Sequence, residues 1–591
     1  MSLVEEPTRP ATEADRRLAT ATAKRRSRAA ATSLKAYGEP LLWLTSGGLA
    51  VSLMMIVGLL GLVVFQGIGT FWPQPVVRVE TVGGKVVQGE VTREQWFRPS
   101  AAVLDQLPES TRDGAREMLA RQEGLGLRRL VRSGNFELTG EHFHWVSDFE
   151  TVSESRPEWA LVVERRTWGR FYGEPVSYLV DGSAVATSAA DVMARLEATL
   201  EEVQDRWDER RVLEVHEIGR VNRHLEEARL AVRGAELAHG RGSTQHQAAV
   251  TAHAELEANT AAEFEAIRSR ILALDAENAR QAVVLRTADG KEARLALADI
   301  VRAYPANRLG FAGSAGVYLS RWWEFLSDDP REANSEGGVF PAIFGTVAMT
   351  LLMSMLVTPF GVLAALYLRE YARGGIVISA VRIAINNLAG VPSIVFGVFG
   401  LGFFCYIVGA GIDELFYAEK LPTPTFGTGG ILWASLTLAL LTLPVVIVAT
   451  EEALSAVPNS MREGSYACGA SKWQTIQRIV LPRAMPGILT GMILAIARGA
   501  GEVAPLMLVG AVKLAPELPI DLTLPFVHLE RSFMHLGFHI YDVGFQSQNS
   551  EAAKPMVYTT TLLLISIIAT LNLSAIWLRA RLRRRFITSQ F

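Results

Sequence analysis

Six long apolar runs constrain the fold of this 591-residue chain more than any other feature of its sequence. Each run has about 20 residues or more, which is the length that an α-helix needs to cross the hydrocarbon core of a bilayer. The sequence therefore predicts an all-α polytopic membrane protein with six transmembrane helices, and an even number of crossings places both termini on the same side. The predicted spans lie near residues 41–66, 340–368, 389–410, 429–450, 485–510 and 556–578.

Lysine and arginine residues near the span ends predict the orientation, because cytoplasmic flanks carry the excess of these residues. Basic clusters precede the first span and follow the second, the fourth and the sixth, whereas the loop after the third span has only Lys420 against several acids. Both termini and the loop between the fourth and fifth spans are therefore expected in the cytoplasm. The clusters are Lys24, Arg25, Arg26, Arg28 and Lys35; Arg369, Arg373 and Arg382; Arg462, Lys472, Arg478 and Arg483; and Arg579, Arg581, Arg583, Arg584 and Arg585.

Residues 67–338, between the first and second spans, are far more numerous than a connection requires, so this segment must contain a domain. Residues 76–91 and 283–296 alternate around a Gly-Gly and an Asp-Gly pair and predict β-hairpins. Residues 188–280 carry apolar side chains at helical spacing, broken near Gly240, and predict a long helical hairpin of coiled-coil type. The expected domain is a large periplasmic α+β insert with a β-rich base. Further strands are expected at 136–146, 159–166 and 174–186.

The rest of the chain divides simply. Residues 1–40 have too few large apolar side chains to bury a core and predict a disordered cytoplasmic tail. Residues 339–578 hold the last five spans, and residues 579–591 form a basic cytoplasmic tail. No G-x-x-x-x-G-K-[ST] string and no metal-ligand spacing occurs, so the sequence predicts no catalytic site, no metal site and no bound cofactor. The net charge of -3 gives no attraction to nucleic acid.

A polar segment between the fourth and fifth spans carries the pattern E-x5-G-x9-I-x-L-P. Two short helices are expected in it, because a glycine in the middle allows either a tight turn or a close approach of another backbone. The proline is expected to stop the second helix before the fifth span. The residues of the pattern are Glu463, Gly469, Ile479, Leu481 and Pro482, and Ala470 follows the glycine.

Two charged residues lie inside the predicted fifth span. Arg498 and Glu502 are four residues apart, which places them on one face of a helix and close enough to pair. A charge at this depth is costly and marks a functional site by default, although a self-neutralising structural pair is the alternative. Gly499 and Gly501 favour close helix packing beside them. Asn386 and Asn387, at the start of the third span, can donate hydrogen bonds in the same pathway or cap a helix.

The polar pattern resembles the cytoplasmic coupling loop of ABC-transporter permeases, the membrane subunits that a separate ATPase drives. A narrower resemblance is to PstA-type permeases of the phosphate-specific importer. It is carried by the strings Glu336–Thr346, Asn386–Gly397, Val457–Glu463 and Ala497–Pro505. The resemblance implies a type I ABC importer permease core in the bacterial inner membrane, which is not an enzyme. In this setting Arg498 is expected to meet phosphate as it crosses, Glu502 to hold the guanidinium in place and keep the anion from binding too tightly, and the coupling-loop residues to contact the ATPase.

The same resemblance implies partners that this chain lacks. They are a second, PstC-like permease, a PstB-like ATPase dimer that holds ATP and Mg, and a periplasmic phosphate-binding protein. Three alternatives stay open. The chain can be the PstC-like subunit instead, the permease can carry another oxyanion, or the chain can be a membrane scaffold or sensor in which the helical hairpin is the working part. The insert departs from the short connection usual in this family, and its arm is either a spacer or docking arm or an insertion that packs only on itself.

Overall fold

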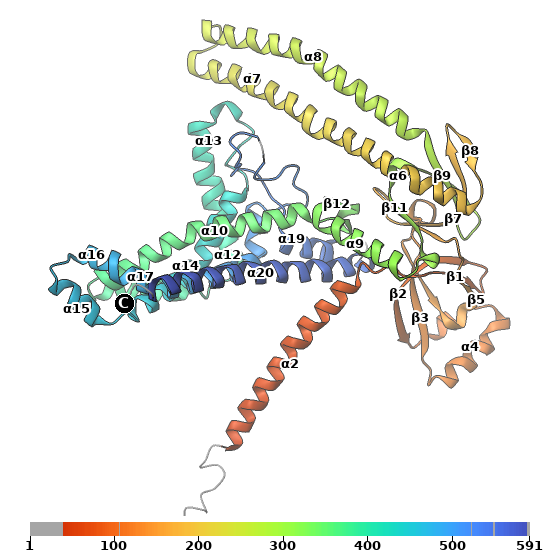
Figure 1. The fold of residues 1–591 in the computed structure, drawn as a ribbon, viewed down its shortest axis with the longest axis horizontal. Helices are drawn as coiled ribbons and strands as arrows, with labels where there is room; N and C mark the ends of the chain where they lie inside the picture. Colours follow the sequence, from red (N-terminus) through yellow and green to blue (C-terminus); the bar gives the residue numbers. More distant parts are fainter. Residues whose placement is uncertain (1–38, 106, 522, 548–549, 588–591) are drawn as a thin grey trace, which may run out of the picture. The chain divides into compact units, whose positions relative to one another are not determined.

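The computed structural model describes residues 39–105, 107–521, 523–547 and 550–587 (Figure 1). The predicted tail over residues 1–40 lies outside the described residues except for its last two. The chain divides into two compact units, residues 1–66 and 67–591. In the first unit and just beyond it, the first predicted span is one continuous helix, α2 (Glu39–Gly69).

Within the described part of the chain, six helices are long and apolar enough to cross a membrane, as the sequence predicted. The last five belong to the membrane core. The second span is α10 (Phe340–Leu366) with the helical turn after it, and the third contains α12 (Ser393–Phe399) and α13 (Ala410–Phe416). The fourth span is α14 (Ile431–Ser455). The fifth joins α16 (Lys472–Thr475) and α17 (Leu481–Gly501) in one helix, and the sixth lies in α20 (Ser550–Ile587).

Small residues hold the core helices together. A Cβ on Gly361 of α10 would lie 2.5 Å from the side chain of Val446 of α14. On α17, a Cβ on Gly491 would lie 2.7 Å from Ala449, and one on Gly487 would lie 2.4 Å from Ala453. Such distances leave no room for a side chain, so the glycine backbones of α10 and α17 pack directly against side chains of α14, as glycines allow in membrane helices.

The fifth span differs from its prediction at both ends. It runs over Lys472–Gly501 rather than 485–510. Pro482 does not stop a helix, because the chain widens into a π-helical turn over Ile476–Val480, where Leu481 N–H donates to the carbonyl five residues back. A wider turn accommodates the missing N–H and the ring of a proline.

The same span also ends earlier than expected. Glu502 has extended backbone angles, φ −81° and ψ 133°, and a separate short helix, α18 (Ala504–Val509), follows it. Pro505 explains the break, since it has no N–H to donate to the carbonyl of Gly501. Arg498 therefore lies in the last turn of α17 and not at the centre of a span.

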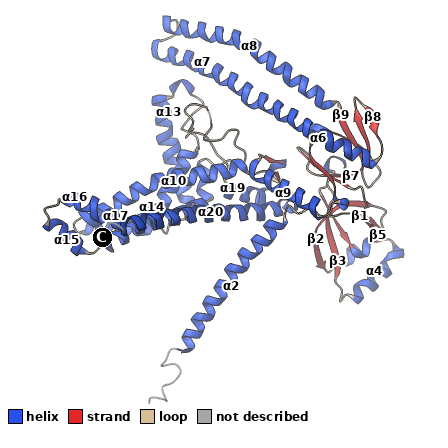
Figure 2. Cartoon of the chain, viewed as in Figure 1, coloured by secondary structure: helices blue, strands red, loops and turns tan. Residues whose placement is uncertain are grey.

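The insert contains two large antiparallel sheets and a two-stranded one of β12 (Pro330–Arg331) and β13 (Glu336–Gly337), and the labelled strands in Figure 2 belong to the two large sheets. The first has strand order β4-β3-β2-β1-β5 and the second β10-β9-β7-β6-β11, with β8 paired to β7. Both predicted hairpins are confirmed, as β1 with β2 and as β9 with β10. The strands are β1 (Val76–Thr81), β2 (Val86–Phe97), β3 (Gly126–Arg132), β4 (Phe143–Ser147), β5 (Thr151–Ser155), β6 (Leu161–Arg165), β7 (Phe171–Val180), β8 (Ser183–Ala186), β9 (Gln281–Arg286), β10 (Glu292–Ala296) and β11 (Ile300–Pro305).

One predicted strand of the insert, 136–146, is wrong in its first half. Residues Phe136–Thr139 form a short helix, α5, and only β4 is extended. Left-handed backbone at Asn135 (φ 55°) and Gly140 (φ 70°) brackets the helix. Asparagine and glycine are the residues that adopt this conformation most readily, so the local turn chemistry overrides the strand pattern.

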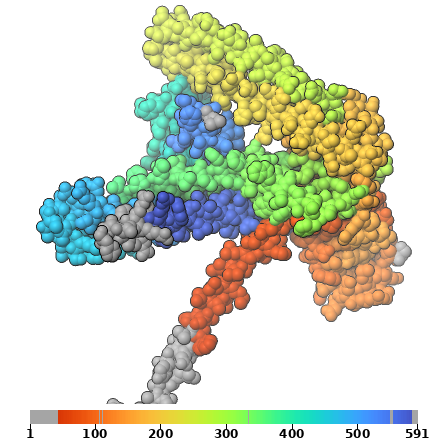
Figure 3. Space-filling view, in the orientation of Figure 1, coloured from red at the N-terminus to blue at the C-terminus, as the bar shows by residue number. Residues whose placement is uncertain are grey.

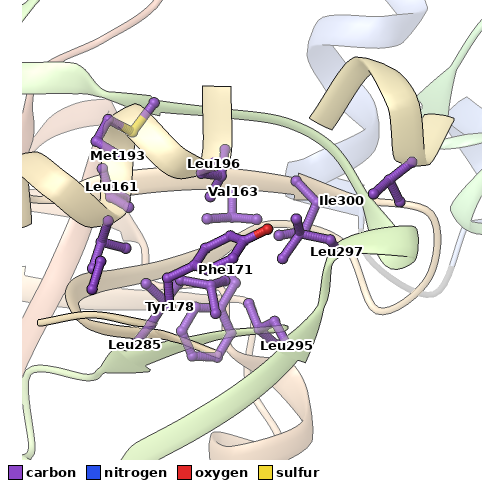
Figure 4. Close-up of a cluster of buried hydrophobic side chains, with 14 residues drawn as sticks. Leu161, Val163, Phe171, Tyr178, Met193, Leu196, Leu285, Leu295, Leu297 and Ile300 are labelled. Carbon is purple, nitrogen blue, oxygen red and sulfur yellow. The ribbon is translucent and has the colours of Figure 1, made fainter. Parts of the chain in front are cut away.

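The second sheet packs against a helical arm. α6 (Ala189–Val212) covers the sheet, and its Leu196 joins Leu161, Phe171 and Leu285 in the buried cluster of Figure 4. Aromatic and branched side chains from the strands and the helix fill one core, and burial of each side chain stabilises the insert by roughly 1.5–3 kcal/mol. The expected hairpin over residues 188–280 thus begins inside the folded base.

Beyond the base, the two arms of the hairpin pair with each other. α7 (Ile218–His239) returns through Gly240 and Gly242 into α8 (Thr244–Ala279). Arginines on the outgoing arm meet acids on the returning arm, with Arg210 2.7 Å from Asp275 and Arg220 2.7 Å from Glu263. These cross-arm pairs fix an antiparallel register.

A buried ion cluster joins the sheets to α9 (Phe311–Ser327), the helix that precedes the second span. Glu164 of β6 accepts from Arg321 of α9 (Nε to Oε1, 2.9 Å) and also pairs with Arg302 of β11. Glu90 of β2 accepts from Arg170 at 2.6 Å and from the Tyr172 hydroxyl at 2.8 Å. Glu164 and Glu90 each have at least two partners, which offsets much of the cost of burying their charges, although Glu90 Oε1 and Arg170 Nε have no hydrogen-bond partner among the described residues.

Candidate functional site

The charged pair of the membrane core lies at the break between α17 and α18. Arg498 Nε lies 3.7 Å from Glu502 Oε1. The side chains are 36% and 22% exposed, so both are partly buried. The expectation that one helical face carries both residues is wrong, because Glu502 lies past the end of α17 in extended backbone. They meet because the chain turns there, not because of helical spacing.

The hydrogen-bonding capacity of this ion pair is only partly used. Arg498 Nε is buried and has no hydrogen-bond partner among the described residues. A contact of 3.7 Å is an ion pair but is too long for a hydrogen bond. Burying a donor without an acceptor costs about 1–3 kcal/mol. The arrangement therefore leaves a buried guanidinium N–H available to an anion.

The two glycines beside the pair play different roles. A Cβ on Gly499 would lie 2.4 Å from Met353 Sδ of α10, so this glycine lets the two helices approach closely. For Gly501, no described atom lies within 4 Å of the Cβ position, and the expected packing role is wrong within this chain. Close packing at Gly499 fixes the last turn of α17, and with it Arg498, against the second span.

Asn386 and Asn387 do not lie where the sequence placed them. They belong to a separate short helix, α11 (Ile376–Leu388), whereas the third span begins at Ser393. Both side chains are exposed. Among the described residues, no hydrogen bond joins either asparagine to Arg498 or Glu502, so the structure does not bring the four pathway candidates into one site within this chain.

The loop between the fourth and fifth spans forms two helices around a left-handed glycine. α15 (Asn459–Ala467) carries Glu463, and α16 follows Gly469, whose φ is 80°. Ser471 caps α16 by accepting from the N–H of Gln474 at 3.2 Å, while the Gln474 side chain accepts from the N–H of Ser471 at 2.9 Å. This capping box explains why a helix starts directly after the turn.

Gly469 is required by conformation and not by crowding inside this chain. No described atom lies within 4 Å of the position that its Cβ would occupy. An L-residue at this φ is strained, at about 1 kcal/mol or more. Ala470 behind it is half-buried, as are Ile479, Leu481 and Pro482 along the helix that leads into the membrane.

Residues outside the predicted pattern anchor this loop. Arg462 pairs with Glu370, at the end of the second span, at 2.9 Å and also donates to the carbonyls of Leu454 and Val457. Ser465 and Thr475 link the two helices at 2.8 Å. In the sequence, Arg462 is an orientation signal and part of the string Val457–Glu463, and its separation from Glu370 gives no indication of the contact. The anchors leave an outward face, seen at the left end of Figure 3, on which Tyr466 is 42% and Trp473 56% exposed.

Among the described residues, no group of three or more histidine, cysteine, aspartate or glutamate side chains could hold a metal ion.

Comparison with known proteins assigns the family. Residues 357–588 match the family described as binding-protein-dependent transport system inner membrane component. The chain is 36% identical over 275 residues to phosphate transport system permease protein PstA 1 of Mycobacterium tuberculosis (strain CDC 1551 / Oshkosh), which is 46% of this chain and 81% of that protein. The chain belongs to the PstA family of phosphate transport system permease proteins.

Other PstA relatives agree with this assignment. The PstA protein of Yersinia pestis is 34% identical over 258 residues, or 44% of this chain and 78% of that protein. Among solved structures, the MetNI methionine ABC transporter aligns at 21% identity and a TM-score of 0.31 over 41% of this chain and 94% of that chain, a score too low to argue from. The family match begins at residue 357, so it excludes the insert. As a PstA-family member with six apolar helices among the described residues, the chain is a multi-pass inner-membrane transport component.

Proposed function

We propose that this chain is the permease subunit of an ABC importer that moves inorganic phosphate into the cytoplasm, with ATP hydrolysed by a partner. The observation that carries the proposal is the similarity to PstA proteins over 81% of a relative's length. The unsatisfied Arg498 Nε supports it, because an importer of anions needs a cation in the membrane that is not fully neutralised. Glu502, at 3.7 Å, holds the guanidinium and limits how tightly an anion binds.

In this proposal the remaining pathway candidates, Asn386 and Asn387, line the transport pathway at an interface with a second subunit. Asn386 and Asn387 are exposed on α11 and have no contact with Arg498 among the described residues. A PstC-like permease that packs against α11 would bring its own surface over them. The two asparagines then donate hydrogen bonds from the subunit interface and not from a site within this chain.

The outward face of α15 and α16 is the proposed contact with a PstB-like ATPase dimer that holds ATP and Mg. Glu463 is exposed there beside Tyr466 and Trp473, and aromatic side chains of this kind are favoured in protein interfaces. The anchors from Arg462 to Glu370 support transmission, since they tie this loop to the end of the second span. Gly469, Ala470, Ile479, Leu481 and Pro482 position the loop in this proposal.

The orientation follows from the same assignment. The coupling loop lies in the cytoplasm with both termini, and the insert of residues 67–338 lies in the periplasm with a phosphate-binding protein. The helical arm is an extension of coiled-coil type, which its cross-arm ion pairs support. It also contacts the core, where Arg223 of α7 lies 3.7 Å from Glu517.

The experiment that tests the proposed function is phosphate uptake into proteoliposomes that contain the complete complex, with and without this subunit. Uptake should require this chain and ATP, and a large excess of sulfate should not compete. Sulfate uptake in place of phosphate would mean that the permease carries another oxyanion. Normal phosphate uptake without this chain would contradict the proposal altogether.

Coupling is tested at Gly469, where Gly469→Glu should abolish ATPase binding because it adds both backbone strain and a charge to the contact face. Gly469→Asn is the matched control, since asparagine tolerates left-handed backbone and carries no charge. It should keep at least half of the ATPase binding. Co-purification of the ATPase with equal amounts of membrane-inserted chain measures both variants, and undiminished binding by Gly469→Glu would contradict the assignment.

A further inference from the structure

A second buried donor lies beside the break between α17 and α18. His535 is 0% exposed, just before the short helix α19 (Leu536–Tyr541). Its Nδ1 accepts a hydrogen bond from the N–H of Gly537 at 3.1 Å. Its Nε2 is buried and has no hydrogen-bond partner among the described residues.

The hydrogen bond to Gly537 determines which ring nitrogen carries the proton. Burial lowers the pKa of His535 to about 4, so the ring is neutral near pH 7. A neutral imidazole has one N–H donor and one acceptor nitrogen. Because Nδ1 accepts, the proton is on Nε2. The unpartnered atom is therefore an N–H donor, like the unpartnered Nε of Arg498.

Contacts with two other elements place His535 beside the break that holds Arg498 and Glu502. A Cβ on Gly537 would lie 2.6 Å from Val503, the residue after Glu502, and 3.1 Å from the His535 ring. On the other side, Leu536 N–H donates to Thr346 Oγ1 of α10 at 2.9 Å. The backbone on either side of Gly537 is thus held between the break and the second span.

The second span also shows which of the two donors, His535 or Arg498, lies nearer to the insert. α10 touches Leu536 through Thr346, and it touches Gly499, next to Arg498, through Met353. Thr346 and Met353 are two turns apart on α10, which corresponds to roughly 10 Å. Thr346 is nearer the start of α10, where the chain enters from the insert. His535 therefore lies on the insert side of Arg498.

We propose that His535 is a second anion contact of the transport pathway, whose Nε2–H donates to a phosphate oxygen on the insert side of Arg498. The inference rests on the proposed function for the identity of the anion. A neutral donor suits this position, because it can bind a tetrahedral oxyanion and release it toward the fixed charge of Arg498. Both donors are buried in this conformation, so the anion meets them when the pathway opens.

Two substitutions of His535 distinguish the role of its Nδ1 from the role of its Nε2. His535→Asn keeps an acceptor near the Nδ1 position for Gly537 and removes the Nε2 donor. His535→Gln places an amide donor near the Nε2 position and loses the Nδ1 acceptor. If His535 only holds the backbone, asparagine should replace it well and glutamine poorly. If it binds the anion, the order is reversed.

The measurement is phosphate uptake per ATP hydrolysed in proteoliposomes that contain the complete complex and the binding protein, per assembled complex. For His535→Asn, this ratio should fall about tenfold through loss of a hydrogen bond to a charged group, with normal assembly. His535→Gln should keep the ratio within about threefold of wild type. His539→Asn is the matched control, because His539 is as buried and both of its ring nitrogens also lack a partner among the described residues. His539 differs in lying near Asp542 and Lys513 and not beside Val503, so its ratio should match wild type.

Each other outcome overturns the proposal. A normal ratio for His535→Asn, equal ratios for the two His535 variants, or failure of both variants to assemble would make His535 a packing residue. Failure of the proposed function is distinguished by the wild-type complex, which would then carry no phosphate. In that case the same variants are measured with the oxyanion that the wild type does carry.

Discussion

Two groups of buried charges in this chain differ in how completely they are paired. In the insert, Glu164 receives hydrogen bonds from Arg321 at 2.9 and 2.5 Å and pairs with Arg302 as well. In the membrane core, Arg498 has one contact to Glu502, at 3.7 Å, and a buried Nε without a partner. Two atoms of the insert cluster, Glu90 Oε1 and Arg170 Nε, have no hydrogen-bond partner among the described residues, but the charges around Glu164 meet within hydrogen-bond distance. Charges held this closely are satisfied by each other, whereas the longer contact of Arg498 leaves its guanidinium open to an anion. The first arrangement is suited to stability and the second to passage of an anion.

The largest expected effect comes from removing both members of the core pair. Arg498→Leu with Glu502→Leu should abolish phosphate uptake while the complex assembles, because an apolar replacement of a buried ion pair is often neutral for folding. Uptake per assembled complex is the measurement. Uptake like that of wild type would show that the pair is only structural and would remove the contrast between the two groups of charges.

The next largest effect concerns the insert. Glu164→Leu should destabilise it by about 3–5 kcal/mol, because Arg321 and Arg302 then lose their shared acceptor while still buried. Thermal unfolding of the purified full-length chain and limited proteolysis within residues 67–338 measure this loss. At a temperature where the variant is folded, its uptake per assembled complex should equal that of wild type. A change in that ratio would give the ion cluster a part in transport.

A smaller effect is expected from pH. Burial raises the pKa of Glu164, but Arg321, Arg302 and Arg170 outweigh burial and hold the pKa well below its usual range. Since the folded-state pKa is lowered, the stabilisation is complete above the unfolded value of about 4.5 and is lost as the pH falls below it. Proteolysis of the insert should therefore accelerate between about pH 4.5 and pH 3. Glu164→Gln should show a weaker pH dependence, and an unchanged one would contradict the assignment.

The smallest effect is expected at the end of the arm. Deleting residues 226–257 and joining the two helices through glycines keeps the pairs Arg210–Asp275 and Arg220–Glu263, so the base should remain folded. Exposed tips with glycine tolerate such changes, and phosphate uptake should stay within about twofold of wild type. Loss of uptake by a well-assembled variant would show that the deleted part of the arm takes part in transport.

Local patterns in the sequence were sufficient to predict much of the fold. Six apolar runs predicted the six long helices, and Asp289-Gly290 predicted the hairpin of β9 and β10, because apolar length and turn chemistry act over neighbouring residues. Gly469 was expected to allow either a turn or a close backbone approach, and its φ of 80° shows that it forms the turn. The spacing of Arg498 and Glu502 predicted their contact, although the geometry that produces it is a break and not a helical face.

The tertiary structure alone decided the features that depend on distant partners. Pro482 continues a helix because a π-helical turn precedes it, and that hydrogen-bond register cannot be read from proline alone. Glu164 finds Arg321 more than 150 residues away, since the strand order brings β6 to α9. His535 carries no motif, and its unpartnered Nε2 follows from the bond of Nδ1 to Gly537 and from burial by elements far along the chain. Charge pairing and burial are properties of three-dimensional neighbours, so only the folded chain determines which side chains are satisfied and which remain free for a ligand.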